Sequence, residues 1–596
     1  MPRSKAARSR APMVPAFSSA VQRLPAAAGR ANRWVAIGLF VVLLAVYLSN
    51  LRVLSAGDSI PTRLLPFSII REGNLNLDEF GWLWSDRLPY YVRFREGHLY
   101  SGTTVATSLL LAPLYLAPAW VLSAYDVPYD DVRARLLIVA MERVCAASLT
   151  ALSASLLYLV LGRLVKWGWA LALALTYALG TNAWAISSQA LWSHTLNGLA
   201  LVVLSALFLR RDCSITAAVL AGLTAAVTLA NRPQMLGFVL LASLFVWNHH
   251  RRRFVAFAAL PVLGALLVAV YNLRVFNVLA GAYVKFDNFS TPLLTGLAGL
   301  LFSPNRGLFV YTPIMVFAFW GAIRVWRTPA PAWLRYLAVG LAAHLVLYAK
   351  FNEWWAGYTF GPRYMTEMMP VLCLFLVYGL VPWCRSRAAH VFVALLIVYG
   401  VAVQAVGVYW DDDDWNRTPV PLQMRPARVW DWSDWQVVRA ARSGFKGSEL
   451  AGVLRDSFSD STPAFLSPLT REDLASEFQV LGAPTTLPTG GTTSIEASIT
   501  NRGAQSWPAF AGDLRVRYLV FLIVRWFAEE QPLAGVGDVL WLPQNLAPGD
   551  SLKMSVPLQA PSAPGHYEVE LRITQALDGS RGISSSDAYR FPVTVN

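Results

Sequence analysis

Charged residues are scarce in this chain. Only 14% of its 596 residues are Asp, Glu, Lys or Arg, whereas about a quarter of the residues of a soluble protein are charged. Hydrophobic residues make up 55%, and the mean hydropathy is +0.44. This composition excludes an ordinary soluble globular protein. Because the apolar residues gather in runs of roughly 20, the length needed to cross hydrocarbon, the sequence predicts a polytopic membrane protein.

Cysteine is also rare, and no metal-ligand spacing is present. The four cysteines are Cys145, Cys213, Cys373 and Cys384, so the long C-terminal region has no disulfide. The net charge of +14 does not indicate a nucleic-acid partner, because the basic residues lie in the N-terminal tail and in short clusters between apolar runs. Cytoplasmic loops of membrane proteins have this pattern.

A cleavable signal pattern is missing from residues 1–33. This segment carries seven basic and no acidic residues, and the apolar run that starts at Trp34 is long enough to stay as an anchor. We therefore expect residues 1–33 to form a basic tail on the cytoplasmic side.

Twelve apolar runs follow between residues 34 and 409, and basic clusters indicate how many of them span. If the run 104–124 lies in the interface, all five clusters between later runs become cytoplasmic, as the positive-inside rule favours. Pro113 and Pro118 within it are typical of a bent, non-spanning helix. We predict a mainly α bundle of about eleven spans over residues 34–410 in the cytoplasmic (inner) membrane, with the C-terminus outside. Its first outer loop is 51–135.

Residues 411–475 are predicted to be an extracytoplasmic linker, and residues 476–596 a β-sandwich. In the second region apolar residues alternate with polar ones, and Gly and Pro punctuate the runs. The alternating sets are Tyr567, Val569, Leu571 and Ile573; Ile495, Ala497 and Ile499; and Leu514, Val516 and Tyr518. The stretch ITNRGAQSWP resembles immunoglobulin-like domains of bacterial surface proteins. The run YLVFLIVRWF (518–527) predicts either a core strand or a loop tip that touches lipid.

Asp58 stands out among the acids of the first outer loop. Any solvent-exposed loop contains acidic residues, so the other acids of this loop, taken singly, need no further explanation. They are Asp78, Glu79, Asp86, Asp126, Asp130 and Asp131. Asp58 instead lies in GDS, about two turns after the first span and just before the helix-like run RLLPFSIIREG, with Pro61 near its start, where proline is tolerated. This placement predicts a carboxylate at membrane level, close to the neighbouring spans.

The layout resembles the C-type fold glycosyltransferase superfamily, whose members span the membrane many times and use lipid-phosphate sugars. An acid at the start of the first outer loop, a helix ending in Gly and an amphipathic apolar segment are matched at Asp58, at Arg71–Gly73 and at 104–124. The resemblance covers roughly residues 34–410. Within the superfamily it points to the group resembling dolichyl-phosphate-mannose-protein mannosyltransferases (family 39), although SGTTVATSLLLAP departs from that group's Pro-Pro-Leu signature.

A single carboxylate suits the reaction that this resemblance implies. The leaving group of a polyprenyl-phosphate sugar is already an anionic phosphate and needs no proton, so one base is enough to take the proton from the attacking hydroxyl. A glycosidase needs two carboxylates. We therefore predict that Asp58 is the general base of an inverting transfer from a polyprenyl-phosphate sugar to an extracytoplasmic glycan, lipid or protein.

Cations are needed to hold the donor phosphate, and arginine fits phosphate oxygens best. Arg363 in GPRY and Arg306 in PNRG each follow a rigid turn just before a span, and both are predicted phosphate ligands unless they only snorkel beside aromatic belts. Lys285 and Arg232 are weaker candidates. Tyr358 and Tyr364 flank Arg363 and are candidate substrate contacts.

Two intramembrane positions carry polar groups that are expensive there. Glu142 and Arg143 predict either a local ion pair or, for Glu142, a supporting or metal-binding acid. His194, at the outer end of a span, predicts a substrate contact or a hydrogen-bonded interfacial histidine. Metal use stays open: the resemblance allows a divalent cation on Asp58, with Glu367 and Glu353 as further acids. The DDDD run (411–414) is either a solvated loop or a cation site.

Two other functions remain open at this stage. A transporter or lipid flippase would also span the membrane many times, but such proteins often have related halves with polar groups at the midplane, and the sequence shows no internal repeat. A non-catalytic scaffold presenting the sandwich would leave Asp58 and the two arginine turns without a role.

Overall fold

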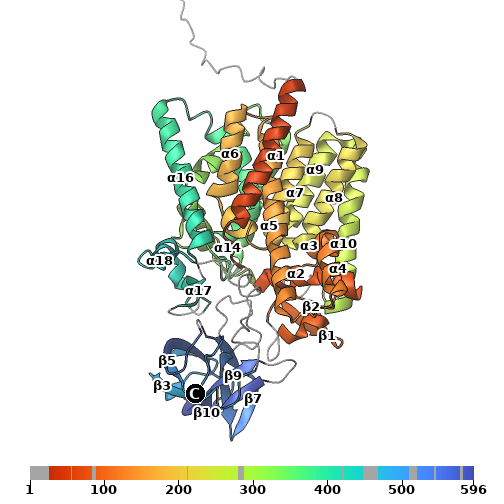
Figure 1. The fold of residues 1–596 in the computed structure, drawn as a ribbon. Coiled ribbons are helices and arrows are strands. Elements are labelled where there is room, and N and C mark those ends of the chain that lie inside the picture. Colours follow the sequence, from red (N-terminus) through yellow and green to blue (C-terminus); the bar gives the residue numbers. More distant parts are fainter. Residues whose placement is uncertain are drawn as a thin grey trace, which may run out of the picture.

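The computed structural model describes residues 26–54, 57–83, 89–210, 213–279, 288–411, 413–418, 422–423, 425–446, 468–508, 520–542, 545–576 and 582–596. Within these ranges the chain forms a helical bundle followed by a β-rich region (Figure 1). The helices are α1 (Ala26–Leu48), α2 (Ile60–Phe67), α3 (Ala106–Leu111), α4 (Leu116–Ala124), α5 (Val132–Leu161), α6 (Trp167–Gly180), α7 (Ser193–Phe208), α8 (Ile215–Asn231), α9 (Leu236–His249), α10 (Phe254–Phe276), α11 (Leu293–Phe302), α12 (Leu308–Tyr311), α13 (Met315–Arg324), α14 (Ala332–Lys350), α15 (Met369–Gly379), α16 (Arg387–Tyr409), α17 (Asp414–Arg417) and α18 (Gln436–Arg442).

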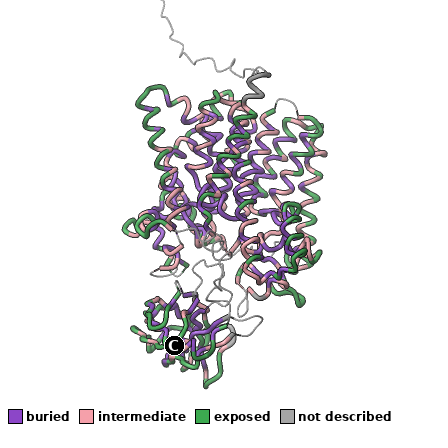
Figure 2. Tube along the Cα trace, viewed as in Figure 1, coloured by how far each residue is buried: buried purple, intermediate pink, exposed green. Residues whose placement is uncertain are grey.

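The helices form a bundle whose surface is apolar. Within the described ranges, five helical segments are long and apolar enough to cross a membrane: Ala106–Ala124, Val132–Leu161, Arg251–Phe276, Ala332–Lys350 and Arg387–Tyr409. In the most apolar windows of Arg251–Phe276 and Arg387–Tyr409, only 11% and 33% of the residues are buried, and Figure 2 shows exposed residues on the outside of the bundle. Long apolar faces left uncovered by protein are stable against lipid, so the chain is a multi-pass membrane protein.

The segment 106–124 has a broken helix. A 3₁₀ turn (Ala112–Tyr115) with Pro113 separates α3 from α4, and in Figure 1 both helices lie beside α2, at the end of the bundle nearest the β-rich region. By length and apolar character alone the segment could cross a membrane. Its predicted place in the interface and the total of about eleven spans therefore stay predictions.

The helix-like run after Asp58 is confirmed. Asp58 lies in a 3₁₀ turn (Gly57–Ser59), α2 follows with Pro61 in its first turn, and a π-helical turn (Ser68–Glu72) continues it. Gly73 ends the run in the left-handed region at φ +67°, where glycine is the favoured residue. A hairpin of β1 (Val92–Arg95) and β2 (His98–Ser101) lies in the same outer loop.

Glycines permit a close contact between α13 and α15. A Cβ on Gly379 of α15 would lie 1.8 Å from the carbonyl oxygen of Phe317 in α13, and one on Gly321 would lie 1.9 Å from that of Phe375. Small residues that let two backbones approach are typical of helix packing in membranes, where dispersion contacts replace the hydrophobic effect.

The described residues between 413 and 446 pack against the bundle more closely than an irregular connector would. They include α17, a 3₁₀ turn (Pro426–Trp430) and α18. Trp415, Leu422 and Val429 share an apolar cluster with Trp354 and Tyr348 of the bundle. The segment therefore belongs to the packed core at this end of the bundle.

The C-terminal region is β-rich and has two sheets. One has the order β4-β10-β9-β6-β7, in which only the β4–β10 pair is parallel, and the other has the order β3-β5-β8. Buried residues of both sheets form one apolar cluster. The strands are β3 (Ser476–Leu481), β4 (Thr486–Leu487), β5 (Thr492–Asn501), β6 (Val520–Ala528), β7 (Gln531–Trp541), β8 (Ser551–Gln559), β9 (Gly565–Ala576) and β10 (Gly582–Val595).

The predicted alternation of apolar and polar residues corresponds to strands in the structure. Ile495, Ala497 and Ile499 are buried on β5, and Val569, Leu571 and Ile573 on β9. The run 518–527 is a core strand rather than a lipid-touching tip, because its described residues form β6, which is paired on both sides and almost wholly buried. The predicted alternation at Leu514, Val516 and Tyr518 lies outside the described residues.

Replacing Gly379 by Ala is expected to destabilise the bundle by about 1–3 kcal/mol, the usual cost of forcing extra atoms into a packed core. The added methyl group meets the backbone of Phe317, which cannot move aside as a side chain can. Thermal unfolding followed by size-exclusion chromatography measures the loss. Gly38→Ala is the matched control, since a Cβ on that glycine meets nothing within 4 Å; equal midpoints for the two variants would contradict the packing argument.

Candidate functional site

Segments far apart in the sequence meet around one cavity of about 460 Å³. This is a common size for small-molecule sites. Its walls come from the start of α2, the loop before α3, the ends of α7, α8 and α10, the end of α14 and the turn before α15. Five of the predicted site residues line it: Asp58, Arg363, Arg232, His194 and Tyr364.

Asp58 and Arg363 form an ion pair at the wall of this cavity. Nη1 of Arg363 donates to Oδ2 of Asp58 at 3.0 Å, across 305 residues of sequence. The hydroxyl of Tyr90 donates to Oδ1 at 2.7 Å. A Cβ on Gly57 would lie 2.7 Å from the ring of Tyr91, so glycine lets this aromatic pair pack against the turn that holds Asp58. The guanidinium of Arg363 and the hydroxyl of Tyr90 thus help to orient the carboxylate.

Aromatic rings surround the guanidinium of Arg363. Its Cζ lies 4.6 Å from the ring centroid of Trp192 and 5.4 Å from that of Tyr364. The Tyr364 ring stacks on Tyr348 with centroids 4.2 Å apart. Gly361, at φ +69°, turns the chain so that Arg363 follows at the wall. Ring faces attract a cation, so they hold this arginine beside the cavity with only 7% of its surface exposed.

A second polar cluster is buried beside the first. Glu367, fully buried, accepts from His194 Nδ1 and lies 3.6 Å from Nε of Arg232. With Nδ1 of His194 donating to Glu367, its Nε2 is left to accept from Nη1 of Arg232 at 3.0 Å. Arg232 also donates to Ser193 Oγ at 3.0 Å and to the hydroxyl of Tyr348. Glu367 does not line the cavity, so it acts by fixing His194 and Arg232, which do.

Another part of the cavity wall is apolar. Leu109, Gly264, Leu267, Val268 and Leu347 belong to it. Leu109 and Leu267 are also 48% and 63% exposed on the outside of the bundle. One cavity therefore combines a charged end with an apolar wall whose side chains are partly exposed.

Glu142 supports the helix that follows Asp58. Its Oε2 accepts from Nη1 of Arg63 in α2 at 3.0 Å, and its Oε1 accepts from the backbone of Leu191 at 3.2 Å. Arg143 donates to Asn50, Gln189 and the carbonyl of Tyr47. The structure thus gives the two neighbours partners on other elements, in place of the local pair that the sequence suggested.

Arg306 does not face the cavity, and its geometry gives it a different role from the predicted phosphate ligand. Its five N–H groups donate to acceptors of the protein itself, among them Asn416 and Gln436. Burial lowers the pKa of Arg306 to about 10, so it stays charged at neutral pH. This arginine ties residues 413–442 to the bundle. Tyr358 also lies away from the cavity, with the guanidinium of Arg417 5.4 Å from its ring.

The remaining predicted residues add little to the site. Lys285 and Asp86 lie outside the described residues. Glu353 has an exposed surface, but partial burial raises its pKa and the charges of Arg363 and Asp58 act on it, so it lies near the charged end of the cavity without lining it. Asp413 and Asp414 of the acidic run pair with Arg417 and Arg439. Across the ranges that the structure describes, no three His, Cys, Asp or Glu side chains gather closely enough to hold a metal ion. Those residues therefore provide no metal-ligand set of this kind.

Sequence reasoning missed Tyr90 and Tyr348. Tyr90 lies in a loop whose course depends on the β1–β2 hairpin, and Tyr348 appears as one more aromatic residue of α14. The signal that the sequence did offer for this site is the polar residues at the ends of apolar runs. Asn231 ends α8 and Arg232 follows it, and Ser193 and His194 begin α7.

Comparison with known proteins gives only distant similarities. The crystal structure of ArnT from Cupriavidus metallidurans bound to undecaprenyl phosphate is 14% identical, with a TM-score of 0.43 and 71% of each chain covered. Pseudomonas fluorescens alkylpurine DNA glycosylase AlkC, bound to DNA containing an abasic site analogue, is 11% identical with a TM-score of 0.15, covering 78% of this chain and 98% of that one. No protein-family model and no curated protein matches the chain. Similarities of this size carry no conclusion about activity.

Replacing Glu367 by Gln is expected to lower the free energy of unfolding by about 3–5 kcal/mol, the cost of leaving one member of a buried ion pair without its partner. Arg232 would then keep its charge beside a neutral amide. Reversible unfolding in a mixed-detergent titration measures the change. Glu96→Gln, at an exposed position of the outer loop, is the control and should stay within about 0.5 kcal/mol of the parent. Equal stabilities of the two variants would contradict the ion-pair assignment.

Proposed function

We propose that this protein is a membrane glycosyltransferase that moves a sugar from a polyprenyl-phosphate donor to an extracytoplasmic acceptor. The observation that carries the proposal is the ion pair of Asp58 and Arg363 at the wall of a cavity whose apolar part includes Leu109 and Leu267, two side chains that are also exposed on the outside of the bundle. A lipid-borne anion and a water-borne hydroxyl can meet only at such a boundary.

In this proposal Arg363 binds the donor phosphate, with Arg232 as a second cation on the same cavity. The phosphate takes the place that Asp58 now holds on the guanidinium, because charge-assisted hydrogen bonds to a phosphate are at least as strong as those to a carboxylate. The aromatic rings of Trp192 and Tyr364 keep Arg363 in place during this exchange. The carboxylate of Asp58 is thereby released next to the anomeric carbon.

The released carboxylate is the general base. The acceptor hydroxyl oxygen attacks the anomeric carbon, and its proton passes to Asp58. The bond between the anomeric carbon and the phosphate oxygen breaks, and the polyprenyl phosphate leaves with the electron pair. One displacement inverts the anomeric centre. Tyr90 keeps the carboxylate oriented through Oδ1.

The apolar part of the cavity suits the donor's hydrocarbon chain. Leu267, Val268 and Gly264 of α10 face Leu109 of α3 across it. A prenyl chain there replaces lipid against apolar walls, while the phosphate stays at the charged end. A flippase would need polar contacts along a path through the bundle, whereas the polar residues of this cavity come from helix ends.

The arrangement in the membrane completes the proposal. The basic tail lies in the cytoplasm, about eleven spans cross the cytoplasmic membrane, and the charged end of the cavity faces outward. The two sheets of the C-terminal region then form an extracytoplasmic immunoglobulin-like sandwich on the same side as the acceptor.

Asp58→Asn is expected to lower kcat by about 10²- to 10⁴-fold, the usual contribution of a general base. The donor KM should not rise, because the substitution removes the anion that competes with phosphate for Arg363. The measurement is sugar transfer or release from polyprenyl-phosphate sugars by the purified protein.

Asp126→Asn is the matched control for this test. Asp126 lies in the same outer loop, is exposed, and has φ +49°, which asparagine adopts as readily as aspartate. An unchanged kcat in Asp58→Asn would remove the base assignment. Donor movement across vesicles without sugar transfer by the parent protein would favour a flippase.

Arg363→Gln is expected to raise the donor KM by about 10- to 100-fold, the loss of one or more hydrogen bonds to a charged group. Binding of radiolabelled polyprenyl phosphate gives the same comparison without turnover. Arg133→Gln serves as the control, since that side chain is 67% exposed and pairs only locally with Asp131. A donor affinity equal to the control's would show that the phosphate binds elsewhere.

A further inference from the structure

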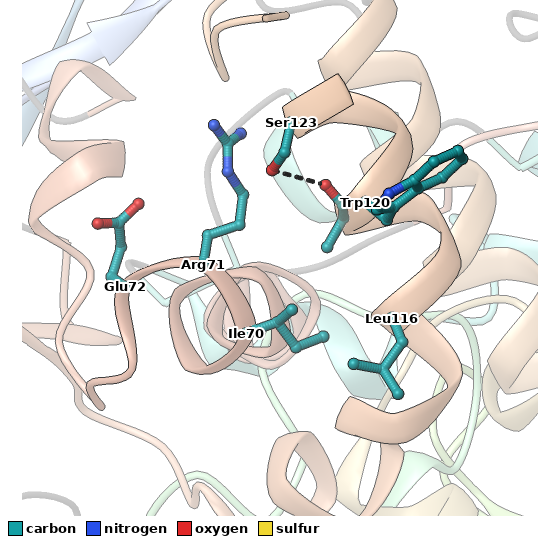
Figure 3. A pocket seen from close by; sticks show the side chains of 7 residues that line it. Ile70, Arg71, Glu72, Leu116, Trp120 and Ser123 are labelled. Atoms are coloured by element: carbon teal, nitrogen blue, oxygen red, sulfur yellow. Dashed lines mark hydrogen bonds between the residues drawn. The ribbon is translucent and has the colours of Figure 1, made fainter. Parts of the chain in front are cut away.

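A second pocket opens on the surface of the bundle, between the π-helical turn after α2 and helix α4 (Figure 3). Its volume is about 550 Å³. It shares no lining residue with the cavity of Asp58. The residues around it are Ile70, Arg71, Glu72, Leu116, Ala119, Trp120 and Ser123.

The apolar wall of this pocket belongs to a face that meets lipid. Leu116 and Trp120 are 57% and 68% exposed, and the neighbouring Leu114 and Tyr125 are 58% and 76% exposed. Such side chains are stable at a membrane surface but not in water. Trp and Tyr concentrate at the depth of the phospholipid headgroups, so the pocket lies where headgroups lie.

The opposite wall carries two opposite charges side by side. Figure 3 shows Arg71 and Glu72 extending from the π-helical turn, across from Ser123 and Trp120. Arg71 stacks over the ring of Tyr129 at 4.7 Å. It lines the pocket and is only partly buried, unlike Arg306, which is buried and donates all five of its N–H groups to the protein. The ring thus positions a cation that the protein does not fully enclose.

The remaining polar group can accept a hydrogen bond. Ser123 donates its hydroxyl proton to the carbonyl of Ala119 at 3.0 Å, so its oxygen keeps its capacity to accept a hydrogen bond. Glu72 is exposed and adds a negative charge. An ammonium group therefore finds acceptors beside the position where a phosphate meets Arg71.

We propose that this pocket binds the headgroup of a zwitterionic, primary-amine phospholipid of the phosphoethanolamine type. The phosphate lies on Arg71, the ammonium on Glu72 and Ser123, and the acyl chains run along Leu116 and Trp120. Charge complementarity selects this occupant: an anionic phospholipid has no group for Glu72, and free inorganic phosphate has no apolar part for the exposed wall.

The site would steady the segment that carries the base. Asp58 and Arg71 lie at the two ends of one continuous stretch of α2 and the π-helical turn. A lipid bound at one end restrains the same segment that presents Asp58 at the other. The binding proposal rests on the pocket alone and does not depend on the proposed transfer reaction.

The test is lipid binding by the purified full-length protein in detergent, followed by native mass spectrometry. Delipidated protein is titrated with phosphatidylethanolamine, with phosphatidylglycerol and with inorganic phosphate. We expect retention of phosphatidylethanolamine in preference to the other two. Arg71→Gln should weaken it about tenfold, as expected for a lost charge-assisted hydrogen bond. Glu72→Gln should weaken phosphatidylethanolamine while leaving phosphatidylglycerol unchanged or stronger.

Arg95→Gln, an exposed arginine of β1, is the matched control. Equal phosphatidylethanolamine binding by Arg71→Gln and Arg95→Gln would overturn the proposal. So would equal retention of phosphatidylglycerol, or displacement of the lipid by inorganic phosphate. Arg71→Lys guards against misfolding, since it keeps the charge: binding that is partly restored in this variant supports the site, and binding that is lost in a stable, monodisperse Arg71→Lys protein counts against it.

Discussion

A charge inside an apolar bundle has to be accompanied by its counter-charge, because desolvation of an unpaired ion costs more than any single contact returns. In this protein the two members of such pairs come from different helices. Glu142 of α5 holds Arg63 of α2, and Glu367, before α15, holds Arg232, after α8. The first pair joins α2 to α5, and the second joins the turn before α15 to the end of α8. Asp58 lies in the turn just before α2, and α2 cannot move without separating Arg63 from the buried Glu142, so the first pair helps to keep Asp58 beside Arg363.

The sequence singled out several residues of the charged end of the cavity, while the roles given to them stay predictions. Residues at the ends of spans on the same side of a membrane must lie at a similar depth, so Asp58, Arg232, His194 and Arg363 could be expected near one another from their places in the apolar pattern. All four line the cavity. Tyr90 could not be found this way, because a residue in a long outer loop has no depth fixed by the pattern.

Arg306 shows where sequence patterns stop being informative. It has the same local signature as Arg363, an arginine after a rigid turn and before an apolar run. What separates the two is the identity of their partners: Arg363 meets Asp58, while Arg306 donates to Asn416 and Gln436, which lie more than 100 residues later. No local pattern encodes such a contact. The same holds for β6, whose unbroken apolar run could be assigned to a sheet interior only once its two neighbouring strands were known.

The hydrogen bonds of Arg306 also define where the membrane half of this protein ends. A chain stopped after α16 would leave this guanidinium without its acceptors on Asn416 and Gln436 and without the Trp415 ring that lies 5.1 Å from its Cζ. The bundle therefore needs residues that follow its last long apolar helix to satisfy a charge within it. A truncation placed where the apolar pattern stops would cut through one packed unit rather than separate two.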